Sequence, residues 1–329
     1  MSIKFLRKHI VASMIVGSVA FFVAGTLSGT YIAWYRVNTC GDAYSFINAE
    51  VICGKPDVIK KTGYIETREK VAKFIEGERN KGRLSEASVY FRDLKHGPVF
   101  GINEFAEFAP ASLLKLPLSL VFLNSAEDQP EVLSAKIQYV GTSTVSDQRV
   151  KPSRSAAPNH AYSIDELLEL MLVYSDNASY EALESFLAAA PHRMQLREEV
   201  FQELGLIDPK DRIESAVNVR GYASIFRILY NVSYLNADLS EKALAWLSRS
   251  EYKEGIVAGV PSGVAVAHKF GERLLDDDTK QLHDCGVVYY ADNPYLLCVM
   301  TRGNDWNELA HVISTISGMV YREVDSRRL

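Results

Sequence analysis

A serine and a lysine three positions apart carry the clearest chemical signal in the sequence. Ser112 and Lys115 follow Pro110 and Ala111, residue types that suit the start of a helix. Residues at positions i and i+3 share one face of a helix, so the Ser112 hydroxyl could meet the Lys115 amine. Unpaired N–H groups at a helix N-terminus also stabilise developing negative charge. The pattern predicts a nucleophile at Ser112 with Lys115 as its base, if burial or a neighbouring cation lowers the pKa of the lysine.

The Ser-x-x-Lys pattern is weak evidence when it stands alone. Average composition gives about one chance match in a chain of this size. Ser250 and Lys253 form a second match, which we attribute to chance. An ordinary helix N-cap is the structural alternative for Ser112. The nucleophile hypothesis therefore depends on other parts of the chain.

Two later segments could complete such a site. Ser175-Asp-Asn177 lies between two apolar helical stretches, where a hydroxyl and a carboxamide could relay a proton and hold a substrate amide. Lys269 and Gly271 lie at the end of a predicted strand. An ammonium there can bind a carboxylate and depress the pKa of Lys115, and a glycine permits close backbone approach. The structural alternatives are turn and cap residues for the first segment and a lysine extending to solvent for the second.

Taken in order, Ser-x-x-Lys, Ser-Asp-Asn and Lys-x-Gly resemble the three signatures of penicillin-recognising serine enzymes, with the class A β-lactamases as the nearest fit. The resemblance covers residues 68–329. It implies an α+β fold, in which a five-stranded antiparallel sheet is flanked by the N- and C-terminal helices and an all-helical lobe is inserted. It implies these roles: Ser112 as acylated nucleophile, Lys115 as base, Ser175 as proton shuttle, Asn177 as substrate ligand, Lys269 as carboxylate ligand, and the N–H groups of Ser112 and Glu272 as oxyanion hole.

Two features depart from the family pattern. Phe270 stands where the third signature usually has Thr or Ser, so a hydroxyl that helps bind a substrate carboxylate is missing, and Arg273 could partly substitute for it. Class A enzymes hydrolyse the acyl-enzyme with a glutamate in a Glu-x-x-Leu-Asn string, which is absent between Asn177 and Lys269. Glu203 is the closest candidate, but its helical surroundings predict a surface residue. The other candidates, which belong to no motif, are Asp208, Asp211 and Glu214.

Local patterns predict the elements that would position these residues. An amphipathic helix is predicted over residues 68–80, a hairpin over 87–102 and a final helix over 305–324. Ser163 and Glu166 form a capping box before an apolar helix. The remaining predicted elements are helices at 177–190 and 220–234 and strands at 264–270, 286–291 and 295–301. Strands at both ends with helices between them predict one sheet closed by both halves of the chain.

The N-terminal segment predicts a membrane anchor. A basic stretch at residues 1–9 precedes a run over residues 10–35 without a charged side chain. The run exceeds the roughly 20 residues that cross a bilayer, and the positive charge before it predicts a cytoplasmic N-terminus. Residues 36–67 would form a linker, and residues 68–329 would be periplasmic or extracellular. A cleaved signal peptide, which would make the protein secreted, is the alternative.

Composition and cysteine spacing limit the remaining classes of site and partner. The net charge of -5, with no basic block after residue 9, argues against a nucleic-acid partner. The four cysteines lack the spacing of a structural zinc site, and neither a metal nor a cofactor is predicted. Cys40 and Cys53 could form a disulfide or remain free thiols in the linker. Cys285 and Cys298 are predicted to be cross-strand neighbours that serve as small buried apolar groups.

The sequence therefore predicts an extracytoplasmic serine hydrolase that forms an acyl-serine with a β-lactam or an acyl-D-Ala-D-Ala peptide. The missing deacylation string leaves a D,D-peptidase or penicillin-binding protein as the first alternative. Phe270 leaves a non-catalytic peptidoglycan-binding module as the second. His268 and His283 have no carboxylate partner that sequence could identify, so both are predicted to be structural.

Overall fold

The computed structural model describes residues 21–31, 44–48, 51, 63–141, 148–206, 216–291 and 293–327. The chain divides into two compact units, Met1–Pro56 and Asp57–Leu329. In the first unit, residues 21–31 form a helix. None of the helices in the described ranges has the length and hydropathy needed to span a bilayer. The rest of the predicted anchor at 10–35, the predicted cytoplasmic residues 1–9, and Cys40 and Cys53 lie outside the described residues.

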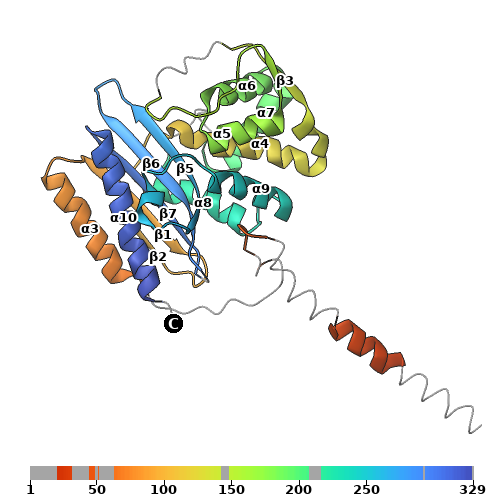
Figure 1. Ribbon diagram of the computed structural model, residues 1–329, viewed down its shortest axis with the longest axis horizontal. Helices are drawn as coiled ribbons and strands as arrows, with labels where there is room; N and C mark the ends of the chain where they lie inside the picture. Colours follow the sequence, from red (N-terminus) through yellow and green to blue (C-terminus); the bar gives the residue numbers. More distant parts are fainter. Residues whose placement is uncertain are drawn as a thin grey trace, which may run out of the picture. The chain divides into compact units, whose positions relative to one another are not determined.

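A five-stranded antiparallel sheet forms the centre of the second unit (Figure 1). Its order is β2-β1-β7-β6-β5. The strands are β1 (Glu86–Asp93), β2 (Val99–Ile102), β5 (Ala265–Leu274), β6 (Lys280–Tyr289) and β7 (Tyr295–Gly303). The early β1–β2 hairpin pairs with the late strand β7, so both halves of the chain close one sheet. The predicted antiparallel sheet is confirmed, and β5 and β6 are longer than the apolar runs that signalled them.

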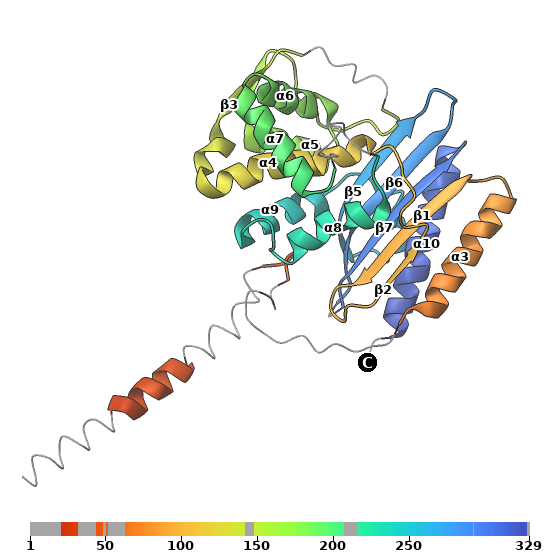
Figure 2. The same ribbon diagram turned by 180° about the vertical axis from the view of Figure 1, so that it is seen from behind.

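The two terminal helices, α3 (Ile65–Asn80) and α10 (Trp306–Ser326), lie side by side over one face of the sheet (Figure 2). Val71 and Ile75 of α3 and Ile316 and Val320 of α10 are buried at helical spacing in one core cluster with the sheet. This amphipathic pattern was visible in the sequence. Helix α3 begins at Ile65, so its first turn takes three residues from the predicted linker.

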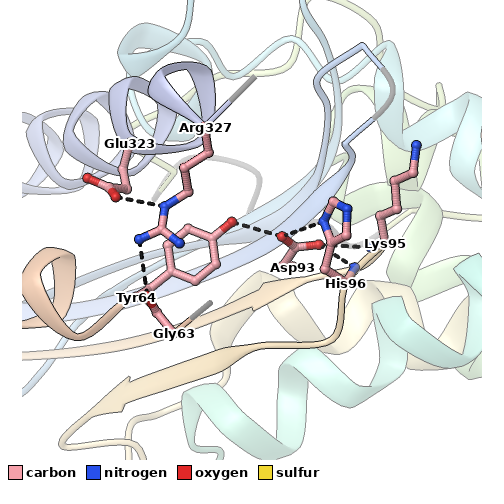
Figure 3. Close-up of polar contacts among 7 residues, drawn as sticks. All are labelled: Gly63, Tyr64, Asp93, Lys95, His96, Glu323 and Arg327. Atoms are coloured by element: carbon pink, nitrogen blue, oxygen red, sulfur yellow. Dashed lines mark hydrogen bonds and ion pairs between the residues drawn. The ribbon is translucent and has the colours of Figure 1, made fainter. Parts of the chain in front are cut away.

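A polar cluster joins the start of α3, the β1–β2 turn and the end of α10 (Figure 3). The Tyr64 hydroxyl donates to Asp93 Oδ2 at 2.8 Å, and the His96 backbone N–H donates to Asp93 Oδ1 at 2.7 Å. Arg327 lies over the Tyr64 ring, with its guanidinium carbon 4.1 Å from the ring centre, and donates to the carbonyl of Gly63 at 3.1 Å. The buried Asp93 carboxylate is thus satisfied by neighbours from two segments.

A helical lobe is inserted between β2 and β5. Ser163 and Glu166 form the predicted capping box at the start of its second helix. A short antiparallel pair, β3 (Lys136–Tyr139) with β4 (His160–Ser163), also belongs to this lobe, so the prediction of an all-helical lobe was wrong in this detail. Strands of four residues carry too little periodicity to be read from sequence. The lobe's helices are α4 (Lys115–Asp128), α5 (Ile164–Val173), α6 (Asn177–Ala188), α7 (Pro191–Glu203), α8 (Val219–Tyr230) and α9 (Ala237–Ser248).

Cys285 and Cys298 are direct register partners on β6 and β7, as the sequence predicted. They form a disulfide rather than two apolar thiols, which corrects our interpretation of them as unlinked core residues. Both residues are fully buried. The disulfide therefore crosslinks the centre of the sheet, one strand away from Lys269, whose register partner on β6 is Cys285.

Candidate active site

The segment that carries Ser112 is a short 3₁₀ helix, η2 (Ala111–Leu114), which continues directly into α4. Side chains at i and i+3 are eclipsed in a 3₁₀ helix, so Ser112 and Lys115 emerge on the same side. Ala111 enters this helix with φ at 50°, in the left-handed region that costs a non-glycine residue about 1–2 kcal/mol. Backbone strain of this kind concentrates at functional sites.

Lys115 is almost wholly buried, with 2% of its surface exposed. Its amine donates to the Ser175 carbonyl, to Ser175 Oγ at 3.2 Å and to Asn177 Oδ1 at 2.7 Å. Burial lowers the pKa of Lys115 to about 7, although the negative charges of Asp176 and Glu272 oppose the shift. A large share of the side chain is therefore uncharged near neutral pH, as a lysine base requires.

The Ser175 hydroxyl lies between two buried lysines. Its oxygen is 3.2 Å from Lys115 Nζ and 2.9 Å from Lys269 Nζ, and Lys269 also donates to the Phe270 carbonyl at 2.9 Å. Burial, reinforced by the charge of Lys115, holds the pKa of Lys269 well below its usual value. Ser175 itself has φ at 56°, so it is the second left-handed residue of the site. The Ser175 hydroxyl thus links Lys115 of the Ser-x-x-Lys signature to Lys269 of the Lys-x-Gly signature.

Ser112 is partly exposed, as a nucleophile must be. Within the described part of the chain its hydroxyl makes no hydrogen bond, so the direct contact with Lys115 that the i, i+3 spacing suggested is not formed. The fold instead brings three acceptors of the Ser-Asp-Asn segment to the amine: the Ser175 carbonyl, the Ser175 hydroxyl and the Asn177 carboxamide oxygen. Apparent catalytic hydrogen bonds are often loose before substrate binds.

Strand β5 approaches η2 closely at Gly271. A methyl group on Gly271 would lie 3.0 Å from Leu113 Cγ and 3.1 Å from the Pro110 carbonyl oxygen. Only glycine fits this contact without displacing one of the two segments. The third signature is thereby held against the turn that carries Ser112.

The last two site residues predicted from the sequence, Glu272 and Arg273, differ in how far they are buried. Glu272 is partly buried, and its Oε1 accepts the Val150 backbone N–H at 3.0 Å. Its Oε2 is buried without a hydrogen-bond partner. Arg273 is exposed, and among the described residues it makes no hydrogen bond or ion pair. The structure thus brings together Ser175, Asn177, Lys115 and Lys269, with Gly271 against the Ser112 turn, and leaves Arg273 outside this group.

Comparison with known proteins decides the family. The model of the beta-lactamase enzyme family matches residues 66–324. The chain belongs to this family. Among curated proteins, none matches the sequence.

Solved structures of the β-lactamase type have the same fold at low identity. PBP-A, whose mutant was solved as an acyl-enzyme complex with penicillin G, is 19% identical, with a TM-score of 0.65 over 82% of this chain and 100% of its own. The class A β-lactamase from Mycobacterium abscessus is 21% identical, with a TM-score of 0.63 over 79% of this chain and 99% of its own. A β-lactamase from Chitinophaga pinensis is 16% identical, with a TM-score of 0.64 over 79% and 99%. At these identities the comparison establishes the fold.

A buried histidine–aspartate pair joins β5 to β6 in this β-lactamase-family chain, next to Lys269 of the third signature. It was not predicted from the sequence. His268 Nδ1 is 2.7 Å from Asp284 Oδ1, and the other oxygen of Asp284 accepts the Ile256 N–H at 2.8 Å. Both side chains are fully buried. Asp284 lies on β6, diagonally across from His268 on β5, and such a register cannot be read from the sequence. His283 differs, because burial lowers its pKa to about 4 and keeps it neutral.

One of the four carboxylates considered for deacylation, Glu203, lies among the described residues of this β-lactamase-family protein. Glu203, at the end of α7, is exposed and accepts a hydrogen bond from the Tyr234 hydroxyl at 2.9 Å. This agrees with its prediction as a surface residue. The other candidates, Asp208, Asp211 and Glu214, lie outside the described residues.

Gln148 is a further site residue that sequence analysis did not find. Its side-chain amide donates to the Ser175 carbonyl at 3.2 Å, so the carbonyl receives both Gln148 and Lys115. Gln148 lies far from all three signatures in the sequence, and no local pattern distinguishes it from other loop residues. Only the tertiary contact reveals its place.

Proposed function

We propose that this β-lactamase-family protein is a serine hydrolase that forms an acyl-serine with β-lactams or related acyl-D-Ala-D-Ala peptides. The observation that carries the proposal is the Ser175 hydroxyl bridging the buried amines of Lys115 and Lys269. Burying two lysines together costs stability, and perturbed groups of this kind concentrate at functional sites. This cost argues against the alternative of a non-catalytic peptidoglycan-binding module.

The proposed reaction begins with uncharged Lys115. Its amine turns from Ser175 and Asn177 toward Ser112 and takes the hydroxyl proton as Oγ attacks the amide carbonyl. The N–H groups of Ser112 and Glu272 receive the developing oxyanion. The proton then passes from Lys115 through the Ser175 hydroxyl to the departing nitrogen, and the C–N bond breaks. Ser112 is left as an ester, and Lys115 is again uncharged.

The test is detection of the adduct on the full-length protein. Incubation with a fluorescent penicillin followed by intact-mass spectrometry should show one covalent adduct, absent in Ser112→Ala. Ser326→Ala, which removes an exposed hydroxyl at the end of α10, is the matched control and should keep the adduct. If Ser112→Ala retains the adduct, or if the unaltered protein forms none, the proposal is wrong.

A D,D-peptidase or penicillin-binding protein is the second candidate, and the exposed position of Glu203 favours it. Without a carboxylate to activate water, the acyl-serine would persist. Time-resolved mass spectrometry with a chromogenic cephalosporin distinguishes the two. An adduct that disappears as colour develops indicates a β-lactamase, whereas a lasting adduct without sustained colour indicates a penicillin-binding protein.

We further propose that residues 68–329 lie on the outer side of a membrane, anchored by residues 10–35. The uncharged run at 10–35 and the buried Cys285–Cys298 disulfide support this location, because structural disulfides persist mainly in oxidising compartments. Protease treatment of intact cells or spheroplasts should digest the domain from outside. Protection of the domain until the membrane is lysed would contradict the proposal.

A further inference from the structure

Ala109 is held through both of its backbone polar groups by side chains of strand β6. Its N–H donates to Gln281 Oε1 at 3.0 Å. Its carbonyl oxygen lies 3.1 Å from Nε2 of His283. Because a carbonyl oxygen can only accept, this ring nitrogen carries the proton and donates it. Two side chains of one strand thus hold the same backbone residue, one at its donor and one at its acceptor.

The two side chains on β6 belong to one buried surface of the sheet. Gln281 and His283 are two positions apart, so they lie on the same face of the strand, and both are buried. Burial lowers the pKa of His283 to about 4, so near pH 7 its imidazole is neutral and has a single N–H. The register partner of His283 on β5 is Gly271, which packs against the turn that carries Ser112. Neighbouring positions on two strands therefore support this turn.

Ala109 lies directly before the strained part of the Ser112 turn. Pro110 has no N–H, and its carbonyl accepts the Leu113 N–H at 3.0 Å within the turn itself. Ala111 has φ at 50°, a backbone conformation that persists only where the surrounding structure enforces it. Holding both polar groups of Ala109 fixes the position and direction of the chain where it enters this turn.

The turn also has anchors in the helical lobe that do not involve β6. The buried hydroxyl of Tyr222, on α8, donates to the Leu113 carbonyl at 2.8 Å. Phe108 and Val217 exchange two backbone hydrogen bonds, at 2.8 and 2.9 Å. These contacts remain when a side chain of β6 is changed. A change on β6 should therefore loosen the turn without detaching it from the domain.

We propose that Gln281 and His283 are positioning residues, which hold Ala109 so that the hydroxyl and N–H of Ser112 face the substrate carbonyl. This inference rests on the proposed acyl-serine function. Neither side chain transfers a proton in the reaction, because both are buried and make their hydrogen bonds to Ala109. Loss of either hydrogen bond should slow the chemical step and leave noncovalent substrate binding nearly unchanged.

The experiment compares two replacements of His283 in the full-length protein. His283→Gln keeps an N–H donor at a reach close to that of Nε2, whereas His283→Met has a similar length and no donor. Both replacements remove the ring, so a role in packing alone would affect them equally. Gln281→Met removes the acceptor of the Ala109 N–H in an independent variant. The matched control is His311→Met, on the exposed side of α10.

Acylation by penicillin G, followed by intact mass across substrate concentration, gives a limiting rate and a half-saturating concentration. In His283→Met and in Gln281→Met the limiting rate should fall about tenfold or more, and the half-saturating concentration should change less than about threefold. His283→Gln should keep most of the rate, and His311→Met should keep all of it. Equal slowing of the two His283 variants, or a normal rate in either methionine replacement on β6, would overturn the inference.

Failure of the proposed function is distinguishable from failure of this inference. If adducts form but the two His283 variants acylate alike, the positioning role falls and the acyl-serine proposal stands. If the unaltered protein forms no adduct, the proposed function fails, and hydrogen exchange decides whether β6 holds the turn. Backbone amides of residues 108–116 should then exchange faster in His283→Met than in His283→Gln. Equal exchange would overturn the inference, and if His283→Met does not fold, Gln281→Met against the unaltered protein decides by the same measurements.

Discussion

The hydroxyl of Ser175 lies 2.9 Å from the amine of Lys269, although 94 positions separate the two residues in the chain. The contact crosses from the helical lobe to strand β5, so the lobe and the sheet share one buried polar cluster. Ser175 is held there by the loop between α5 and α6, in a left-handed backbone conformation. Its hydroxyl lies within hydrogen-bond distance of both lysine amines.

Removing the Ser175 hydroxyl should slow acylation, whereas thermal stability should depend on which residue replaces the serine. Ser175→Ala and Ser175→Gly both delete the hydroxyl that we propose as the proton shuttle, so both should slow acylation about 10²-fold or more. At φ 56° glycine also relieves the backbone strain that alanine retains, so the glycine variant should unfold at the same or a higher temperature than the alanine variant. Acylation kinetics and thermal denaturation check both parts. A glycine variant with normal acylation would remove Ser175 from the mechanism.

The acylation rate should rise with pH as Lys115 loses its proton. Because burial lowers the pKa of Lys115 to about 7, the base is uncharged above that pH and charged below it. Lys115→Arg, which keeps a permanent charge, should abolish the rise and reduce the rate at every pH. The check is a pH–rate profile of adduct formation from pH 5 to 9. A flat profile in the unaltered protein would argue against a lysine base.

The lowered pKa of Lys115 should also make the free energy of unfolding depend on pH. The unfolded chain binds more protons than the folded chain between the folded pKa of Lys115, about 7, and its usual value of 10.5. The contribution of Lys115 to the free energy of unfolding should therefore increase as the pH rises through that window. Lys115→Met should lose this dependence. Denaturant titrations of both proteins at pH 7 and pH 9 measure the difference.

Gly271→Ala should damage the site through packing. The new methyl group meets Leu113 and the Pro110 carbonyl at 3.0 and 3.1 Å, so β5 and η2 must separate. We expect about 1–3 kcal/mol of lost stability and at least tenfold slower acylation. Gly77→Ala in α3 is the control, since nothing lies within 4 Å of its added methyl group. A Gly271→Ala variant with unchanged acylation would show that the contact does not position Ser112.

The disulfide should stabilise the fold without taking part in catalysis. Replacing Cys285 and Cys298 together by alanine should lower the free energy of unfolding by about 2–4 kcal/mol. Acylation at 20 °C should persist, because the bridge joins β6 to β7 and not to β5. Denaturant unfolding of this variant tests the loss of stability, and adduct formation tests whether acylation persists. An unchanged free energy of unfolding would show that the disulfide does not stabilise the fold.

Features that depend on local pattern were predicted from the sequence, and most contacts between distant segments were not. The Ser163 capping box, the β1–β2 hairpin and the apolar stripe of α10 were readable because each is encoded within a few turns or residues. The ordered signatures around Ser112, Ser175 and Lys269 predicted the family.

Contacts across the sheet and between lobe and sheet were not readable. The His268–Asp284 pair and the Gln148 contact each require a strand register or a loop path that single-sequence periodicity does not contain. Cys285 and Cys298 were predicted to be cross-strand neighbours, but the disulfide between them was not predicted. The preference of Lys115 for Asn177 over Ser112 depends on which acceptors the fold brings closest, so helix spacing alone predicted the wrong partner.

The hydrogen bond from Arg327 to the carbonyl of Gly63 has a practical consequence for the design of altered chains. It places Gly63 and Arg327, the first and last described residues of the second unit, beside each other. Joining these two ends by a short linker and opening the chain at an exposed loop should give a circular permutant that still folds. A reporter attached after residue 327 would likewise emerge beside Gly63.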